Sequence, residues 1–378
     1  MTRTKLFVAF ALVFLPAAVL TSAPAPTDTL HLAPGGKVKV GNLFVHDAAL
    51  IDENRIVIVG RTGDTDPAKD APSEGLPNGA IISLATKSAQ PFTNQHTSQM
   101  WSVSSYAGQV VTGSTGWNCA AVLRIWDLKA QESRAAAKLD DAAGTCQAKC
   151  FHKSGRIVVD ATERLVVLDP AKPGERLELG CPPGVEWLSY PLAVSPDDAW
   201  IACIDDRDQV VCFEVATKKA TVVAIAPKDA GEKWIVCGLT FSPSGKLFVC
   251  RRGQDQDEVP KGKEEKDVPA ERRGIVRIDL PEGRVVPLNM GHIVCTSGCA
   301  IERTETWLAT VGASRPGKKP DGEYVGELRV YNLSSGKLAY REQLQDGGPD
   351  RLWFTPSGKR LVGVANGGTV RWWDVPAR

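Results

Sequence analysis

The sequence predicts an all-β fold, a seven-bladed β-propeller over residues 29–378, from three observations. A unit of about 43 residues recurs along the chain, alternating apolar runs in each unit are typical of strands, and 35 Gly and 25 Pro supply many tight turns. A period of about 40 to 45 residues with four short strands is the spacing of a propeller blade. We therefore expect seven four-stranded sheets arranged in a ring.

Residues 1–25 precede the repeats and have the layout of a secretory signal. Arg3 and Lys5 form a basic head, an apolar run follows from Leu6 to Leu20, and small residues end the segment. Because this run is shorter than the roughly 20 residues that a spanning helix needs, we favour a cleaved signal over an uncleaved membrane anchor. The sequence thus predicts a secreted, periplasmic or cell-envelope protein.

Seven markers show where the third strand of each unit ends. Each is an apolar residue, then in most units an acid or amide, then an aliphatic residue or Pro. Upstream of several markers, two apolar strands flank a turn with Pro or Gly, as in Leu239–Leu247 and Trp353–Leu361, which predicts a hairpin. The markers are Ile82-Ser83-Leu84, Trp126-Asp127-Leu128, Leu168-Asp169-Pro170, Phe213-Glu214-Val215, Ile278-Asp279-Leu280, Tyr331-Asn332-Leu333 and Trp373-Asp374-Val375.

These repeats resemble the WD40 family. Trp126-Asp127 and Trp373-Asp374 match its terminal dipeptide, Gly291-His292 matches its Gly-His pair, and Val370–Asp374 matches its third strand. The resemblance covers nearly all of the chain after residue 30. It implies a WD40-like propeller held mainly by packing between blades, with the ring closed by an N-terminal strand.

The last unit predicts the same closure from its own residues. Its strands Arg351–Thr355, Lys359–Ala365 and Thr369–Val375 are not followed by an outer fourth strand. Thr29–Val40 precedes the first inner strand, Leu43–Ile51, and has no other partner. Pairing it beside Thr369–Val375 would remove an open sheet edge.

Three polar insertions break the period, at Arg61–Gly79, Gly253–Arg273 and Ser314–Val325. Each is predicted between the second and third strands of its blade, on the side where one blade connects to the next. We call this side the insertion face. Insertions gathered on one face often mark the working side of a repeat protein, although polar loops also tolerate insertions that have no role. Gly253–Arg273 has almost no apolar residue, and we expect it to be mobile.

The charge balance excludes partners that are recognised mainly by charge. The chain has 45 Lys and Arg against 44 Asp and Glu, a net charge of +1, so we expect no nucleic-acid partner. With 43% hydrophobic residues it has the composition of a soluble protein with a sizeable core.

We expect a monomer that binds a protein partner on the insertion face. Trp187 and Trp234 occupy equivalent positions at the start of neighbouring inner strands, where large aromatics anchor a partner or, alternatively, pack between blades. Basic residues of the insertions complete the candidate partner-binding set, unless they only solvate these loops: Lys261, Lys263, Arg272, Arg273, Arg315 and Lys318.

No motif in the sequence predicts catalysis. Asp64, Asp66 and Asp70 lack the Gly and distal Glu of a calcium loop, and we expect neither a metal nor another cofactor. We favour a non-catalytic interaction scaffold. The alternative is a propeller enzyme, lactonase-like or hydrolase-like, with its site at the central channel, for which the inner strands offer His46, Asp47, and Glu302 or Arg303.

Ten cysteines in an exported protein favour disulfides over zinc, because no C-x2-C pair occurs. A two-residue turn at Arg207-Asp208 would set Cys203 opposite Cys212. A four-residue turn would likewise set Cys237 opposite Cys250. Bridges between directly opposed strand residues are strained, and the alternative is two reduced pairs packed as small apolar side chains.

Overall fold

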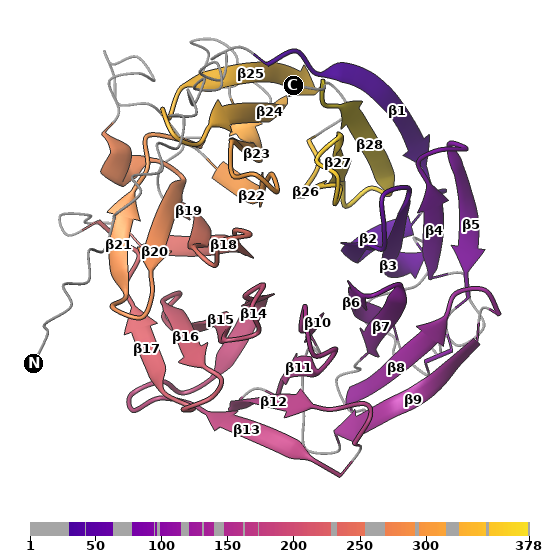
Figure 1. Cartoon of the computed structure of the whole chain (residues 1–378), viewed down its shortest axis with the longest axis vertical. Helices are drawn as coiled ribbons and strands as arrows, with labels where there is room; N and C mark the ends of the chain where they lie inside the picture. Colours follow the sequence, from indigo (N-terminus) through magenta and orange to yellow (C-terminus); the bar gives the residue numbers. More distant parts are fainter. Residues whose placement is uncertain are drawn as a thin grey trace, which may run out of the picture.

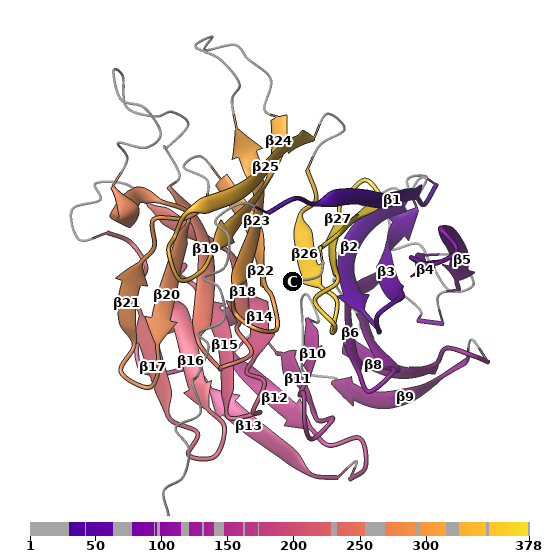
Figure 2. The same ribbon diagram turned by 45° about the horizontal axis from the view of Figure 1, so that its top comes forward.

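Seven antiparallel sheets of four strands form a closed ring in the computed structural model (Figures 1 and 2). Each sheet is one blade, with its first strand nearest the centre of the ring (Figure 1). The predicted all-β, seven-bladed propeller is therefore confirmed. The structure describes residues 30–41, 43–62, 78–93, 95–96, 99–114, 121–130, 132–139, 147–161, 163–172, 174–227, 233–253, 269–291, 295–314, 325–344 and 348–376.

The strands follow one another blade by blade along the chain. A 3₁₀ turn, η2 (Ala270–Arg272), precedes β20, and among the described residues no helix is long and apolar enough to cross a membrane. The predicted signal or anchor at residues 1–25 lies outside those residues. Blade 1 is β2 (Leu43–Leu50), β3 (Arg55–Thr62), β4 (Gly79–Ser83) and β5 (Ser88–Phe92); blade 2 is β6 (Met100–Tyr106), β7 (Gln109–Ser114), β8 (Ala121–Asp127) and β9 (Glu132–Leu139); blade 3 is β10 (Ala148–Cys150), β11 (Ile157–Asp160), β12 (Arg164–Leu168) and β13 (Arg176–Gly180); blade 4 is β14 (Leu188–Val194), β15 (Trp200–Asp205), β16 (Val210–Glu214) and β17 (Ala220–Val223); blade 5 is β18 (Trp234–Phe241), β19 (Leu247–Gly253), β20 (Ile275–Asp279) and β21 (Arg284–Pro287); blade 6 is β22 (Cys295–Ile301), β23 (Trp307–Ser314), β24 (Val325–Asn332) and β25 (Leu338–Leu344); blade 7 is β26 (Arg351–Phe354), β27 (Arg360–Val364), β28 (Thr369–Asp374) and β1 (Ala33–Lys39).

The N-terminal strand β1 closes the ring, as predicted, by pairing antiparallel with β28. Gly36 lies opposite Trp372 in this pairing, beside a register shift after Pro34. A Cβ atom at Gly35 or Gly36 would collide with the Trp372 indole, so the close approach of β1 to this ring requires glycine.

The core of the propeller lies between the blades. Buried apolar side chains in the described residues form seven clusters, and each cluster joins two adjacent blades. Alternate residues of a strand face opposite neighbours, so one strand can contribute side chains to two clusters. One consequence is that Cys203 packs against blade 3 whereas Cys212 packs against blade 5.

In three blades, the turn between the first and second strands carries a carboxylate that binds the same turn of the preceding blade. Each carboxylate accepts a hydrogen bond from a backbone N–H, and we call these contacts the turn latches. They lie on the face opposite the insertions. The pairs are Asp198 with Ser154 at 2.7 Å, Glu305 with Ser244 at 2.6 Å and Glu53 with Ser357 at 3.0 Å.

A buried hydrogen-bonded chain crosses blade 2. The Thr112 hydroxyl lies 2.7 Å from His96 Nε2 and accepts a 2.7 Å hydrogen bond from Trp126 Nε1. Burial and the nearby Arg124 lower the pKa of His96 to about 3, so the imidazole is neutral and its Nε2 accepts the hydroxyl proton. These hydrogen bonds link the segment before β6, which carries His96, to β7 and β8, which carry Thr112 and Trp126.

The three insertions are where the sequence places them, between β3 and β4, β19 and β20, and β23 and β24. These are the second and third strands of blades 1, 5 and 6, so the insertion face is confirmed as one side of the ring. Most residues of the insertions lie outside the described ranges.

The predicted cysteine pairs are wrong, because both hairpins have three-residue loops. Asp205 pairs with Gln209, and Asp208 adopts φ 58°, which shifts the register by one residue. Cys203 therefore lies opposite Val211, and a one-residue shift turns its side chain to the other face of the sheet.

The blade 4 loop is one residue longer than predicted, whereas the blade 5 loop is one residue shorter. Ser242 pairs with Lys246, and Gly245 at φ 83° closes the turn. Cys250 lies opposite Gly238, and Cys237 is the extra residue of a β-bulge.

Candidate functional site

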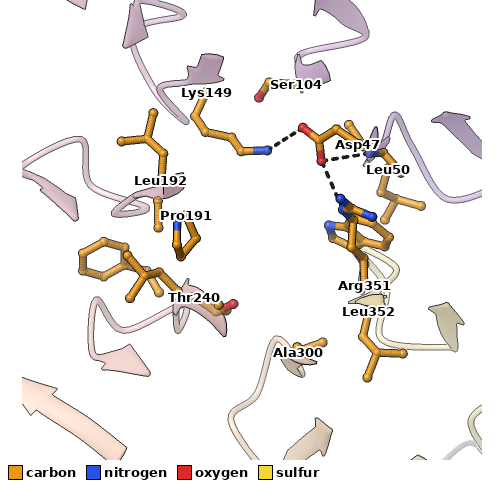
Figure 3. Close-up of a pocket in the computed structure, with 18 of the residues that line it drawn as sticks. Asp47, Leu50, Ser104, Lys149, Pro191, Leu192, Thr240, Ala300, Arg351 and Leu352 are labelled. Atoms are coloured by element: carbon orange, nitrogen blue, oxygen red, sulfur yellow. Dashed lines mark hydrogen bonds and ion pairs between the residues drawn. The ribbon is translucent and has the colours of Figure 1, made fainter. Parts of the chain in front are cut away.

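A channel of about 410 Å³ lies at the centre of the ring, lined by residues from the innermost strands of all seven blades (Figure 3). The inner strands all start on the insertion face, so the first lining residue of each strand lies nearest that face. Asp47 and Arg351 occupy such positions. Charged side chains thus gather in the part of the channel toward the insertion face.

Asp47 is the centre of this charged group and is only 3% exposed. Its carboxylate accepts hydrogen bonds from the backbone N–H groups of Ala48 (2.9 Å) and Val103 (3.1 Å). It also forms ion pairs with Lys149 Nζ at 3.1 Å and Arg351 Nε at 3.4 Å (Figure 3). The two backbone N–H groups and Lys149 supply three hydrogen bonds and Arg351 adds an ion pair, and these contacts tie blades 1, 2, 3 and 7 together.

Arg351 extends the network along the channel mouth. It donates hydrogen bonds to Asn366 Oδ1 at 3.0 Å and to the His46 carbonyl oxygen, and it interacts electrostatically with Tyr190 of blade 4. Burial alone would lower the pKa of Arg351, but Asp47 and Tyr190 outweigh it and raise that pKa. The guanidinium is therefore a fixed positive charge at the channel mouth.

His46 is the extra residue of a bulge in β2 and turns away from the channel lining. Its ring stacks on Trp101 with centroids 4.0 Å apart, and Nδ1 lies 3.3 Å from the Met100 carbonyl oxygen. Burial lowers the pKa of His46 to about 4, so the ring is neutral and a weak base. This geometry is that of a packed aromatic residue.

The other predicted catalytic candidates do not join Asp47. Glu302 and Arg303 lie in the turn after β22, at the end of the inner strand away from the insertion face. Glu302 is buried and accepts a 3.1 Å hydrogen bond from the Thr304 backbone N–H. Within the described part of the chain, no three His, Cys, Asp or Glu side chains are grouped to hold a metal ion, and Asp64, Asp66 and Asp70 lie outside it.

On the insertion face, large aromatic side chains are exposed near the starts of the inner strands of blades 1 and 4. Phe44 is 45% exposed, Trp187 40% and Tyr190 37%, and all three lie at or just before the first half of an inner strand. The Arg61 guanidinium lies 5.2 Å from the centroid of the Phe44 ring, a cation–π contact. We call Phe44, Trp187 and Tyr190 the aromatic rim.

The two tryptophans that the sequence treats as equivalent differ in the structure. Trp187 belongs to the aromatic rim, whereas Trp234 is 3% exposed and packs between blades 4 and 5. The Arg251 guanidinium lies 4.5 Å from the centroid of the Trp234 ring and covers it. Trp234 therefore offers no surface to a partner.

The predicted basic contacts are dispersed. Arg272 is exposed and Arg273 is buried, while the other four lie outside the described residues: Lys261, Lys263, Arg315 and Lys318. Sequence reasoning missed Phe44, Tyr190, Lys149 and Arg351. The signal that could have found them is their position in the inner strands, because polar or aromatic residues there face the channel or its mouth.

No protein-family model matches the chain, and no curated protein matches it in sequence.

Proposed function

We propose that the protein is an exported, non-catalytic propeller that binds a protein partner through the aromatic rim. The observation that carries this proposal is the exposure of large apolar side chains at the insertion-face ends of inner strands. Five large apolar side chains are exposed among the described residues, and three of them form the rim. The other two, Val222 and Leu338, lie on outer strands of different blades.

The chemistry of the rim supports a protein ligand. Tyr and Trp are the residues that most often dominate the affinity of protein interfaces, because they bury large rigid surfaces at low entropic cost. Tyr190 is held by Arg351, and Arg351 by Asp47. The mouth is therefore ordered before a partner arrives, which lowers the cost of binding.

The WD40 resemblance points the same way, since it implies an interaction propeller. The hydrogen bonds of Thr112 with His96 and Trp126 support this resemblance, because they join a His between two blades to a Trp at the end of a third strand. We include WD40-like repeats in the proposal on these grounds.

The enzyme alternative has one observation in its favour, the charged group in the channel. Asp47, however, already accepts three hydrogen bonds and forms an ion pair with Arg351, and His46 lies outside the channel lining. A general base needs a free lone pair directed at its substrate. Hydrolysis of an ester or lactone by the purified protein, lost in Asp47→Asn, would favour the enzyme.

Export is part of the proposal and rests on residues 1–25 alone. Fractionation of the native host should place the protein outside the cytoplasm. A mature N-terminus between residues 22 and 26 is the result expected for a cleaved signal, and a cytoplasmic protein that retains Met1 would contradict export.

Photo-crosslinking tests the binding site directly. A photoreactive amino acid placed at position 44, 187 or 190 in the native host should capture the same protein, whereas one at position 338 should not. Leu338 is the matched control, because it is as exposed as Phe44, at 45%, but lies on β25. Equal capture from position 338 would contradict a binding site at the rim.

A further inference from the structure

Cys250 and Cys299 lie side by side at the interface between blades 5 and 6. Cys250 is on β19, Cys299 is on the inner strand β22, and both belong to the buried apolar cluster that joins these blades. Strands β19 and β22 are in contact, and the Cys250 side chain lies near enough to Cys299 to influence its ionisation. Two sulfur atoms that the longest insertion separates in sequence are therefore neighbours in the fold.

The environment of Cys299 favours its thiolate form. The interaction with Cys250 lowers the pKa of Cys299 in spite of its burial, because it stabilises the thiolate. Cys299 also lines the central channel, through which a small reagent can reach it. The thiolate is the form of cysteine that attacks a disulfide.

We propose that Cys250 and Cys299 form a disulfide that links blade 5 to blade 6 when the protein meets a small external disulfide. The Cys299 thiolate attacks one sulfur of the reagent, which forms a mixed disulfide and releases one thiolate. The Cys250 thiol then loses its proton and attacks the Cys299 sulfur, which releases the second thiolate. One external disulfide is reduced to two thiols, and one protein disulfide forms.

The neighbouring cysteines identify the alternative pairings. Cys237 packs against the same cluster and lines the channel, so Cys237 with Cys250 and Cys237 with Cys299 are the competing bridges. Cys203 and Cys212 face opposite sides of blade 4 and cannot bridge within a blade. The pair Cys250 and Cys299 is favoured over these alternatives, because the two residues lie on adjacent blades within one cluster and Cys250 lowers the pKa of Cys299.

Non-reducing peptide mapping of the full chain tests the proposal. The folded protein is incubated with hydroxyethyl disulfide, and the free thiols are then blocked before digestion. We expect the peptides that contain Cys250 and Cys299 to be linked, and Cys237→Ala to retain that link. Oxidation should also raise the denaturant midpoint, since the bridge closes a long loop in the unfolded chain.

Single Cys→Ala variants distinguish the loss of the disulfide from the general effect of losing a buried thiol. Cys250→Ala and Cys299→Ala should lose both the link and the midpoint shift. Cys212→Ala, which empties a similar site between blades 4 and 5, should keep both. If these variants fail to fold, non-reducing peptide mapping of the parent protein still tests the proposal. A link that involves Cys237, or free thiols at both positions after oxidation, would overturn the proposal.

Discussion

Glu53 of blade 1 binds Ser357 of blade 7 across the seam at which the ring closes. Its carboxylate accepts hydrogen bonds from the Ser357 backbone N–H, at 3.0 Å, and from the Ser357 hydroxyl. The two residues are 304 positions apart in sequence. This turn latch therefore adds to the strand pairing of Gly36 with Trp372 in holding the ends of the propeller together.

Breaking the turn latch between Glu53 and Ser357 should lower the free energy of unfolding by about 1 kcal/mol, the usual net value of a hydrogen bond of this kind. A double-mutant cycle of Glu53→Gln and Ser357→Ala, measured by chemical denaturation, should give a coupling energy of that order. The outcome that contradicts a latch is additivity of the two changes.

The latches also predict acid sensitivity. Burial alone would raise the pKa of Glu53, but hydrogen bonds from Ser357 and the charge of Arg360 outweigh it and lower that pKa below its usual 4.5. A group whose pKa is lowered on folding contributes stability above its unfolded pKa and loses it as the pH falls through the folded pKa. Denaturation midpoints of the parent should therefore fall more steeply below about pH 4.5 than those of Glu53→Gln.

Closure by the N-terminal strand can be tested at one glycine. Gly36→Ala places a methyl group against the Trp372 indole, which must move, and overpacking of this kind typically costs about 1 to 3 kcal/mol. Gly180→Ala is the matched control, because a Cβ there meets no atom of the described structure within 4 Å. Equal denaturation midpoints for the two variants would mean that β1 does not close the ring.

Two buried threonines on second strands should respond in opposite ways to replacement by valine. Thr112→Val leaves His96 and Trp126 without their shared hydroxyl and should cost roughly 2 to 4 kcal/mol. The Thr310 hydroxyl has no hydrogen-bond partner in the described structure, so Thr310→Val should be neutral or stabilising. Similar losses in both variants, measured by denaturation, would refute the hydrogen-bonded chain.

Asp160 predicts a loss of stability toward alkaline pH. Burial raises the pKa of Asp160 to about 8, while a 2.6 Å hydrogen bond from the Gln147 backbone N–H opposes the shift. The folded protein therefore binds more protons than the unfolded chain between about pH 4 and about pH 8, and its stability falls as the pH rises through that window. Asp160→Asn should flatten this slope in denaturation experiments, and an unchanged slope would contradict the assignment.

The repeat pattern was sufficient to predict the architecture. The seven markers fix one strand in each blade, and the missing outer strand of the last unit identifies Thr29–Val40 as its replacement. The first prediction depends on the repeat period, and the second depends on the cost of leaving a sheet edge open. Both can be argued from a single sequence.

Register and exposure could not be predicted in the same way. One residue in a hairpin loop decides whether Cys203 faces Cys212, and the left-handed conformation of Asp208 is not visible in its residue type. Trp187 and Trp234 have equivalent positions, but Arg251 covers only Trp234. The ion pairs of Asp47 depend on which strands meet across the ring, and that is settled only when all seven blades are in place.

The most direct test of the proposed function is the affinity of the photo-crosslinked partner for rim variants. Trp187→Ala should weaken binding to the purified partner by about tenfold or more, as is typical of a dominant interface aromatic, and Leu338→Ala should leave it unchanged. Titration calorimetry gives both dissociation constants. If Trp187→Ala binds as tightly as Leu338→Ala and the parent, the rim is not the binding site.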